Sequence, residues 1–187
     1  MKKILLTGAT GNIGKRLLLV LLDQGYHVVC CTRDMNRFDV PENTPDDRTD
    51  VIEVDFLHKE TLENIPSDID AAYYLMHSMS SGTDYEDMEL TCALNFREKV
   101  SSTQAQQVIY LTGMINSELL SKHLQSRQKV EEELAKGSYH FTALRAGIII
   151  GSGSASFEII RDLVEKIPVM ITPKWVRHDA SLSALQM

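Results

Sequence analysis

The sequence predicts an α/β protein in which helices cover both faces of a parallel β-sheet, a three-layer and doubly wound arrangement. Short apolar runs alternate with longer segments of helical periodicity along the 187 residues, and this alternation is typical of parallel sheets. The chain is long enough to bury one sizeable core. We therefore expect one domain over residues 1–177 and an irregular tail over residues 178–187, which are polar and lack a strand pattern.

The expected strands are short apolar runs bounded by turn residues. They span residues 3–7, 27–32, 51–54, 70–75, 107–112, 140–146 and 168–171. The expected helices lie between them and carry apolar residues three or four positions apart. They span residues 12–24, 59–63, 84–104, 121–136 and 154–166. Residues 39–50 contain two prolines and show no periodicity, which predicts a solvated loop.

Composition excludes several classes of function. The net charge is −7 and the lysines and arginines are scattered, so we expect binding neither to nucleic acid nor to an anionic membrane. No apolar run reaches the roughly 18 residues of a membrane-spanning helix, and we expect a cytoplasmic protein. The three cysteines and the histidines show no ligand spacing, so neither a disulfide framework nor a metal site is expected.

A glycine-rich turn follows the first strand. The segment Thr7–Gly14 reads Thr-Gly-Ala-Thr-Gly-Asn-Ile-Gly and opens a helix. Glycines at such a turn permit a tight exit from the strand, close approach of a pyrophosphate and close helix packing, and the helix N-terminus faces the phosphates. We expect a dinucleotide to contact Gly8, Thr10, Gly11, Asn12, Ile13 and Gly14. The alternative is a turn that uses glycine for backbone geometry alone.

Four segments together resemble one superfamily. They are Thr7–Gly14, residues 71–79 (AAYYLMHSM), residues 144–154 (LRAGIIIGSGS) and residues 168–177 (PVMITPKWVR). The chain resembles the atypical short-chain dehydrogenase/reductases, in particular the NAD(P)H-binding proteins that are NmrA-like or epimerase-like. The resemblance covers residues 3–177 and implies a Rossmann fold that binds NAD(P). Related proteins continue into a substrate-binding region, so by this resemblance the chain is shortened at its C-terminus.

The end of the second strand bears on which dinucleotide is bound. A carboxylate there accepts the ribose hydroxyls of NAD, whereas a cation accommodates the 2′-phosphate of NADP. Asp34 stands where the carboxylate of NAD-binding proteins is expected, but Arg33 precedes it and Arg37 is near. In similar proteins an arginine at this point binds the 2′-phosphate, so we favour NADP over NAD. Arg33 would otherwise be an exposed turn residue.

Two further segments are expected to contact the dinucleotide. By the resemblance, Asp55 and Phe56 match a pair that meets the adenine ring, although Asp55 could instead cap the following helix. Leu75, Met76 and His77 end the fourth strand and should line the crevice at the carboxyl ends of the strands. His77 could act as a base, but a structural role is the alternative.

The active-site signature of the superfamily departs from its usual residues here. Aligned with it, His123 stands at the position of the catalytic tyrosine and Arg127 at that of the lysine. Arginine can bind a ribose but cannot relay a proton, and Arg127 with Glu131 could be an ordinary ion pair on a helix. Thr112 offers the hydroxyl that completes the usual triad, while Tyr110 shares its strand face and is expected to be a packed residue.

These observations predict an NAD(P)(H)-binding protein of the atypical short-chain dehydrogenase/reductase type. They allow a weak oxidoreductase or epimerase-like activity on an unknown small-molecule substrate. The alternative is a non-catalytic redox sensor or regulatory module, in which the dinucleotide changes the affinity for a protein partner. A true reductase that uses His123 as its acid is a third alternative. Whether the protein is an enzyme, and whether it forms a homo-oligomer, stays open at this stage.

Overall fold

The computed structural model describes residues 1–38, 46–76, 85–113, 122–147, 149 and 155–166. The chain divides into two compact units, residues 1–147 and 148–187. In the second unit the described element is helix α4 (Ala155–Lys166), on which Arg161 pairs with Glu158 at 2.5 Å and Lys166 with Asp162 at 2.6 Å. The predicted strand at 168–171 and the predicted boundary at residue 177 lie outside the described residues.

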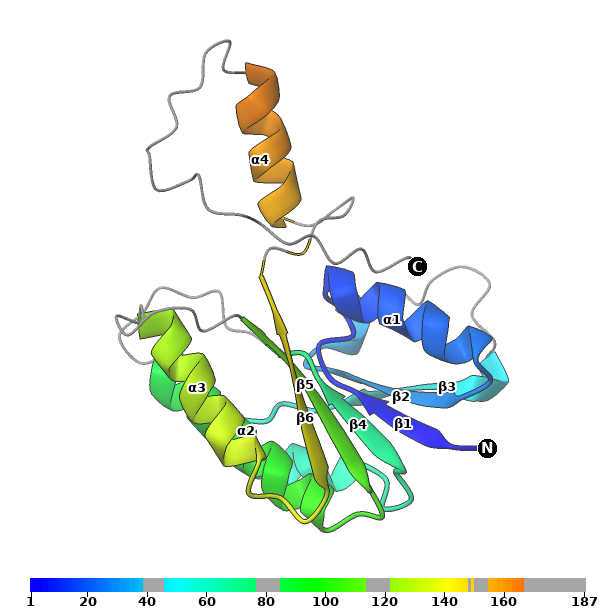
Figure 1. Ribbon diagram of the computed structural model, residues 1–187. Helices are drawn as coiled ribbons and strands as arrows, with labels where there is room; N and C mark the ends of the chain where they lie inside the picture. The colour runs from blue at the N-terminus through cyan, green and yellow to red at the C-terminus, as the bar shows by residue number, and fades with distance from the viewer. Residues whose placement is uncertain (39–45, 77–84, 114–121, 148, 150–154, 167–187) are drawn as a thin grey trace. The chain divides into compact units, whose positions relative to one another are not determined.

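A parallel sheet forms the centre of the first unit (Figure 1). Its six strands are β1 (Lys3–Leu6), β2 (His27–Thr32), β3 (Thr49–Glu53), β4 (Ala71–Tyr74), β5 (Gln107–Gly113) and β6 (His140–Ala146). They lie in the order β3-β2-β1-β4-β5-β6, the order of a doubly wound Rossmann fold. The order reverses between β1 and β4, and ligands bind at such a switch point.

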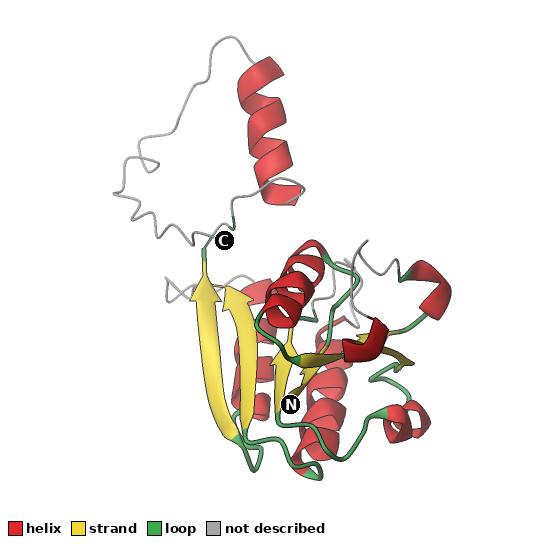
Figure 2. Cartoon of the chain, turned by 90° about the vertical axis from the view of Figure 1, so that its right-hand side faces the viewer, coloured by secondary structure: helices red, strands yellow, loops and turns green. Residues whose placement is uncertain are grey.

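Three helices cover the two faces of this sheet (Figures 1 and 2). Helix α1 (Asn12–Asp23) packs on one face, while α2 (Tyr85–Ser101) and α3 (Lys122–Leu134) pack on the other. Alternation along the strands supplies both layers with apolar side chains: Leu6 faces α1, and Leu5 faces α2 and α3. Cys30 and Cys31 also lie on opposite faces, and both are free.

The predicted strands and helices of the first unit are confirmed to within a few residues at their ends. Residues 59–64 form a 3₁₀ rather than an α-helix. The prediction of a loop over residues 39–50 is wrong at its C-terminal end, because residues 46–48 form a 3₁₀ turn and β3 begins at Thr49. Arg48 holds this segment against α1, since its guanidinium donates to the Leu22 carbonyl oxygen at 2.9 Å. Such a long-range contact leaves no periodic signal in the sequence.

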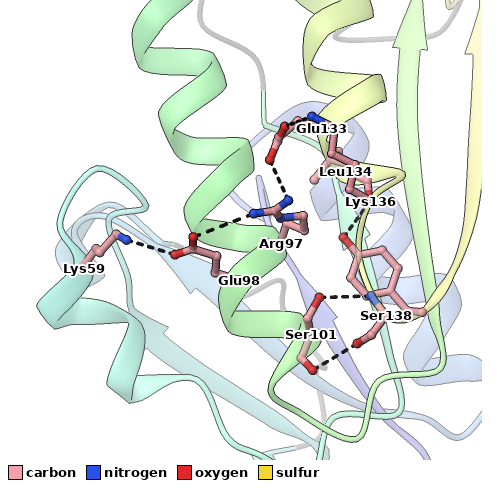
Figure 3. A network of polar contacts seen from close by, with 9 residues as sticks. Lys59, Arg97, Glu98, Ser101, Glu133, Leu134, Lys136 and Ser138 are labelled. Atoms are coloured by element: carbon pink, nitrogen blue, oxygen red, sulfur yellow. Dashed lines mark hydrogen bonds and ion pairs between the residues drawn. The ribbon is translucent and has the colours of Figure 1, made fainter.

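A chain of charged side chains joins the helices that cover the second face (Figure 3). Arg97 of α2 lies between Glu98 and Glu133 and contacts the Glu133 carboxylate of α3 at 3.0 Å. Lys136 approaches the other oxygen of Glu133 at 2.6 Å, and Lys59 pairs with Glu98 at 3.0 Å. Glu133 is 8% exposed, so it is the member whose charge depends most on its partners.

We expect Glu133→Ala to lower the free energy of unfolding by about 1–3 kcal/mol, because it leaves the half-buried Arg97 without its shortest ionic partner. The matched control is Glu98→Ala, which removes an exposed partner from the same network and should cost less than about 1 kcal/mol. Urea unfolding of both variants measures the difference. Equal losses in the two variants would contradict the ranking.

Candidate functional site

The site begins where β1 and β4 end side by side. The Thr7 hydroxyl, which is buried, donates to the Tyr73 carbonyl oxygen at 3.1 Å and accepts from the Leu75 backbone N–H at 3.0 Å. One threonine therefore fixes the last residues of β4 against the start of the glycine-rich turn. This is the edge at which the strand order reverses.

Two glycines are required by the geometry of the turn. Gly8 has φ +66°, and a Cβ built on it would lie 2.9 Å from the Leu75 carbonyl oxygen. A Cβ on Gly14 would overlap the Gly8 carbonyl oxygen. The first turn of α1 is therefore seated directly on the end of β1, as close packing of the glycine-rich motif requires.

The N-terminus of α1 can receive an anion. Gly11, which has no side chain, occupies the N-cap position, and the first turn of α1 contains no acidic residue. Backbone N–H groups at a helix start have no partner within the helix and carry the positive end of its dipole. Gly11 and Asn12 both line the cleft described next.

A cleft of about 750 Å³ opens at the carboxyl ends of the strands. Its described lining comes from the glycine-rich turn, from β5 and the ends of β2 and β4, from the segment after β3, and from the two helices of the second face. The lining residues are Gly8, Thr10, Gly11, Asn12, Cys31, Thr32, Arg33, Val54, Asp55, Phe56, Leu57, Tyr74, Leu75, Met76, Met88, Glu89, Cys92, Tyr110 and Val130. Segments far apart in the sequence thus share one concave surface.

Most of the residues expected to bind the dinucleotide line this cleft. They are Gly8, Thr10, Gly11, Asn12, Arg33, Asp55, Phe56, Leu75 and Met76. Ile13, Gly14 and Arg127 are outside the described lining, although Gly14 shapes the turn. His77 and the side chain of His123 lie outside the described residues. Thr112 is buried, with 4% of its surface exposed.

Arg33 and Asp34, the two candidates for choosing the dinucleotide, have different surroundings. Arg33 lines the cleft. The Asp34 carboxylate accepts the Asn36 backbone N–H at 3.0 Å and caps the 3₁₀ turn at residues 35–37, while the Thr32 hydroxyl donates to the Asp34 carbonyl oxygen at 2.9 Å. Asp34 is therefore used in its own turn, and Arg33 is the member of the pair that faces the cleft.

The segment after β3 is held rigidly. The Asp55 carboxylate accepts the Leu57 N–H at 3.0 Å, so it caps this turn and not the 3₁₀ helix that follows. Asn95 of α2, which is 2% exposed, donates from Nδ2 to the Phe56 carbonyl oxygen at 2.7 Å. The rings of Phe56 and Phe96 are 5.6 Å apart. Asp55 and Phe56 thus present a fixed edge to the cleft.

The part of the cleft lined by residues of α2 and α3, together with Tyr110, is called its inner end below. The sequence analysis did not anticipate these helical residues. Met88, Glu89 and Cys92 of α2 line the inner end, and their spacing of three and four residues places them on one helix face. The buried Ser126 hydroxyl of α3 donates to the Glu89 carboxylate at 2.5 Å. The position of α2 directly after β4 was the available signal, because a helix there starts at the ligand-binding edge.

Two ionisable groups at the inner end are kept in their neutral forms. Burial, with a smaller contribution from the negative charge of Asp55, raises the pKa of the Cys92 thiol to about 11. Burial also raises the pKa of Tyr110, while a hydrogen bond from the Thr112 side chain and the positive charge of Arg127 oppose the rise. Both side chains are therefore uncharged near neutral pH.

In the described part of the chain, no group of three or more His, Cys, Asp or Glu side chains is placed to hold a metal ion. Within the same part, no helix has the length and apolar character needed to cross a membrane.

The sequence matches a family model described as NAD(P)H-binding over residues 8–163. The chain therefore belongs to this NAD(P)H-binding family, as the sequence analysis predicted. No curated protein matches the chain.

Solved structures show the same fold at low sequence identity. The enzyme WbmH of Bordetella bronchiseptica in complex with NAD+ is 16% identical, with a TM-score of 0.69 over 89% of this chain and 63% of that one. Triphenylmethane reductase of a Citrobacter species is 16% identical, with a TM-score of 0.68 over 88% of this chain and 55% of that one. UDP-glucuronic acid 4-epimerase of Bacillus cereus in complex with NAD is 19% identical, with a TM-score of 0.66 over 89% of this chain and 64% of that one. The chain thus spans between about half and two thirds of the length of these proteins.

Alanine substitutions at two glycines of the turn should affect different properties, the stability of the fold and the binding of the dinucleotide. Gly14→Ala should destabilise the fold by about 3 kcal/mol or more, because its methyl group overlaps backbone that cannot move aside. Gly11→Ala should remain folded, since the nearest atom to its new Cβ is the Gly8 carbonyl oxygen at 3.2 Å. It should nevertheless weaken dinucleotide binding at least about tenfold, because the methyl group stands where phosphates approach the helix start.

Urea unfolding and titration calorimetry measure the two effects separately. A Gly11→Ala variant that binds NADPH as the wild type does would show that the turn is not the phosphate site.

Proposed function

We propose that the cleft binds NADP(H) in preference to NAD(H), with the diphosphate at the glycine-rich turn and the N-terminus of α1. The observation that carries the proposal is that one cleft is lined by this turn, by Arg33 and by Asp55 with Phe56. The absence of a Cβ on Gly8 and Gly14 lets α1 sit directly over the strand end, which fits a group that must approach backbone N–H donors closely. Membership of the NAD(P)H-binding family supports the binding of a nicotinamide dinucleotide.

The adenine half of the dinucleotide would lie toward the ends of β2 and β3. The Arg33 guanidinium would bind the 2′-phosphate in a fork geometry that a lysine cannot provide. Asp55 and Phe56 would meet the adenine ring, supported from behind by the bond from Asn95 to the Phe56 carbonyl oxygen. The engagement of the Asp34 carboxylate with Asn36 supports Arg33 over Asp34 as the discriminating residue.

The nicotinamide half would lie toward Leu75, Met76 and the inner end of the cleft. When bound, the reduced dinucleotide would supply a hydride to a small-molecule substrate. Arg127 would hold the nicotinamide ribose and contribute positive charge without relaying a proton. Thr112 would orient the neighbouring hydroxyl groups, and His123 would be the proton donor of a weak oxidoreductase or epimerase-like activity.

A second function is a dinucleotide-dependent sensor without catalysis. It is favoured by one observation, the presence of His123 and Arg127 where the superfamily signature has tyrosine and lysine. In this function a protein partner would bind the states with and without dinucleotide differently. The two functions share the cleft and differ in whether the bound dinucleotide is consumed.

The choice of dinucleotide is tested by thermal shift and calorimetry with NAD, NADH, NADP and NADPH. A ligand that binds only the native state raises the melting temperature with the logarithm of its saturation, and we expect the larger rise with NADP and NADPH. Arg33→Gln should weaken NADPH binding about 10- to 100-fold and leave NADH binding unchanged, since it removes a charge-assisted phosphate contact.

Asp34→Asn is the matched variant. We expect it to leave NADPH binding unchanged, whereas a selective loss of NADH binding in this variant would assign the discriminating role to Asp34. A wild-type protein that is stabilised by none of the four dinucleotides would contradict the proposed function.

Catalysis is tested by NADPH oxidation with a panel of quinones, aldehydes and sugar nucleotides. We expect slow turnover of at least one compound, and His123→Ala should lower that rate about 10²-fold or more if the imidazole donates the proton. The control is dinucleotide affinity, which should not change in this variant. Turnover that persists at the wild-type rate would remove His123 from the mechanism, and no turnover of any compound by the wild type would favour the sensor.

A further inference from the structure

The helix that normally supplies the active-site tyrosine of this superfamily has none here. The sequence of α3 is KHLQSRQKVEEEL. The cleft nevertheless contains a phenol close to that helix, because Tyr110 of β5 lines its inner end together with Val130 of α3. Sequence reasoning expected Tyr110 to be a packed strand residue. It is packed, with 1% of its surface exposed, and it also borders the cleft.

We propose that the Tyr110 phenol replaces, from the strand, the hydroxyl that α3 lacks, and that it donates a hydrogen bond to the nicotinamide half of the bound dinucleotide. This inference rests on the proposed function, because it requires the dinucleotide to lie in the cleft. It assigns Tyr110 a role in binding that the superfamily signature does not contain.

The ring of Tyr110 is held in one orientation. Strand alternation places Val108, Tyr110 and Thr112 on the face covered by α2 and α3, and all three are buried. The Tyr110 ring meets the ring of Tyr74 edge-on, with centroids 5.7 Å apart and an interplanar angle of 71°. Because the ring is packed in this way, the hydroxyl is the part of the Tyr110 side chain that can make a polar contact.

The phenol of Tyr110 interacts with a side chain nearer the carboxyl end of β5. Thr112 lies two residues further along the strand, and a side-chain hydrogen bond with it opposes the rise in the pKa of Tyr110. The carboxyl ends of the strands are the edge at which the cleft opens and at which dinucleotides bind. A tyrosine hydroxyl that accepts a hydrogen bond can still donate its own hydrogen to another acceptor.

The charges that face Tyr110 come from both helices that cover it. They are Glu89 of α2 and Arg127 and Glu131 of α3. Burial is the largest influence on the phenol and favours its neutral form. A neutral phenol donates a hydrogen bond near neutral pH, and the ribose hydroxyls and carboxamide of the nicotinamide half offer acceptor oxygens.

The test compares whole dinucleotides with the fragment that lacks the nicotinamide half. Titration calorimetry of the full chain with NADPH, NADH and ADP gives three affinities for each variant. Tyr110→Phe should weaken binding of the tighter dinucleotide about tenfold, the loss expected for one hydrogen bond to a buried donor. It should leave ADP binding within about twofold, because ADP reaches only the other end of the cleft.

Tyr139→Phe is the matched control, since Tyr139 is also a buried tyrosine on the same face of the sheet and is outside the described lining of the cleft. It should change none of the three affinities by more than about twofold. Thr112→Val is the second variant and removes the hydroxyl that interacts with the phenol. It should lower the affinity for the same dinucleotide by a smaller factor, about two- to fivefold, and leave the affinity for ADP unchanged.

Unchanged dinucleotide affinity in Tyr110→Phe, or an equal loss for ADP, would overturn the role of Tyr110 while leaving the proposed function intact. A wild-type chain that binds neither dinucleotide would overturn the proposed function itself. If Tyr110→Phe unfolds, Thr112→Val provides the test. A loss of dinucleotide affinity without a loss of ADP affinity in this variant would support the inference, and the absence of that loss would overturn it.

Discussion

The seating of α1 on the end of β1 is the constraint on which the candidate site depends. Because Gly14 has no side chain, the first turn of α1 can approach the Gly8 carbonyl oxygen, and the Thr7 hydroxyl fixes the end of β4 beside it. This contact aims the N-terminus of α1 at the switch point of the sheet. The cleft, which is lined by Arg33 and by residues of α2 and α3, is built around that corner.

Most of the fold could be predicted from the sequence because local sequence signals agree with the tertiary structure. Apolar runs and helical periodicity located β1 to β6 and α1 to α3 to within a few residues, and the glycine-rich turn identified the cleft. The loop prediction was wrong at residues 46–50 because their structure depends on distant partners, namely the pairing of Thr49 and Asp50 with β2 and the hydrogen bond from Arg48 to α1. A contact between residues distant in sequence has no counterpart in a local pattern.

The candidate site was predicted less completely than the fold, and for a related reason. Sequence motifs identify the lining residues near the glycine-rich turn and the strand ends. Glu89, Cys92 and Val130 line the cleft because α2 and α3 pack side by side, which no motif predicts. The bond between Ser126 and Glu89 joins the two helices at that point. Tyr110 shows the same limitation, because strand alternation predicts its face but not that a cleft borders it.

The state of the cysteines determines how the protein can respond to an oxidising environment. With a pKa of about 11, roughly one Cys92 side chain in ten thousand is a thiolate at pH 7, and burial raises the pKa of Cys30 and Cys31 further still. Oxidants and alkylating agents attack the thiolate, so the three cysteines react slowly with them near neutral pH. In a sensor function, the response would then follow the reduced-to-oxidised ratio of the nicotinamide pool and not the oxidation of these cysteines.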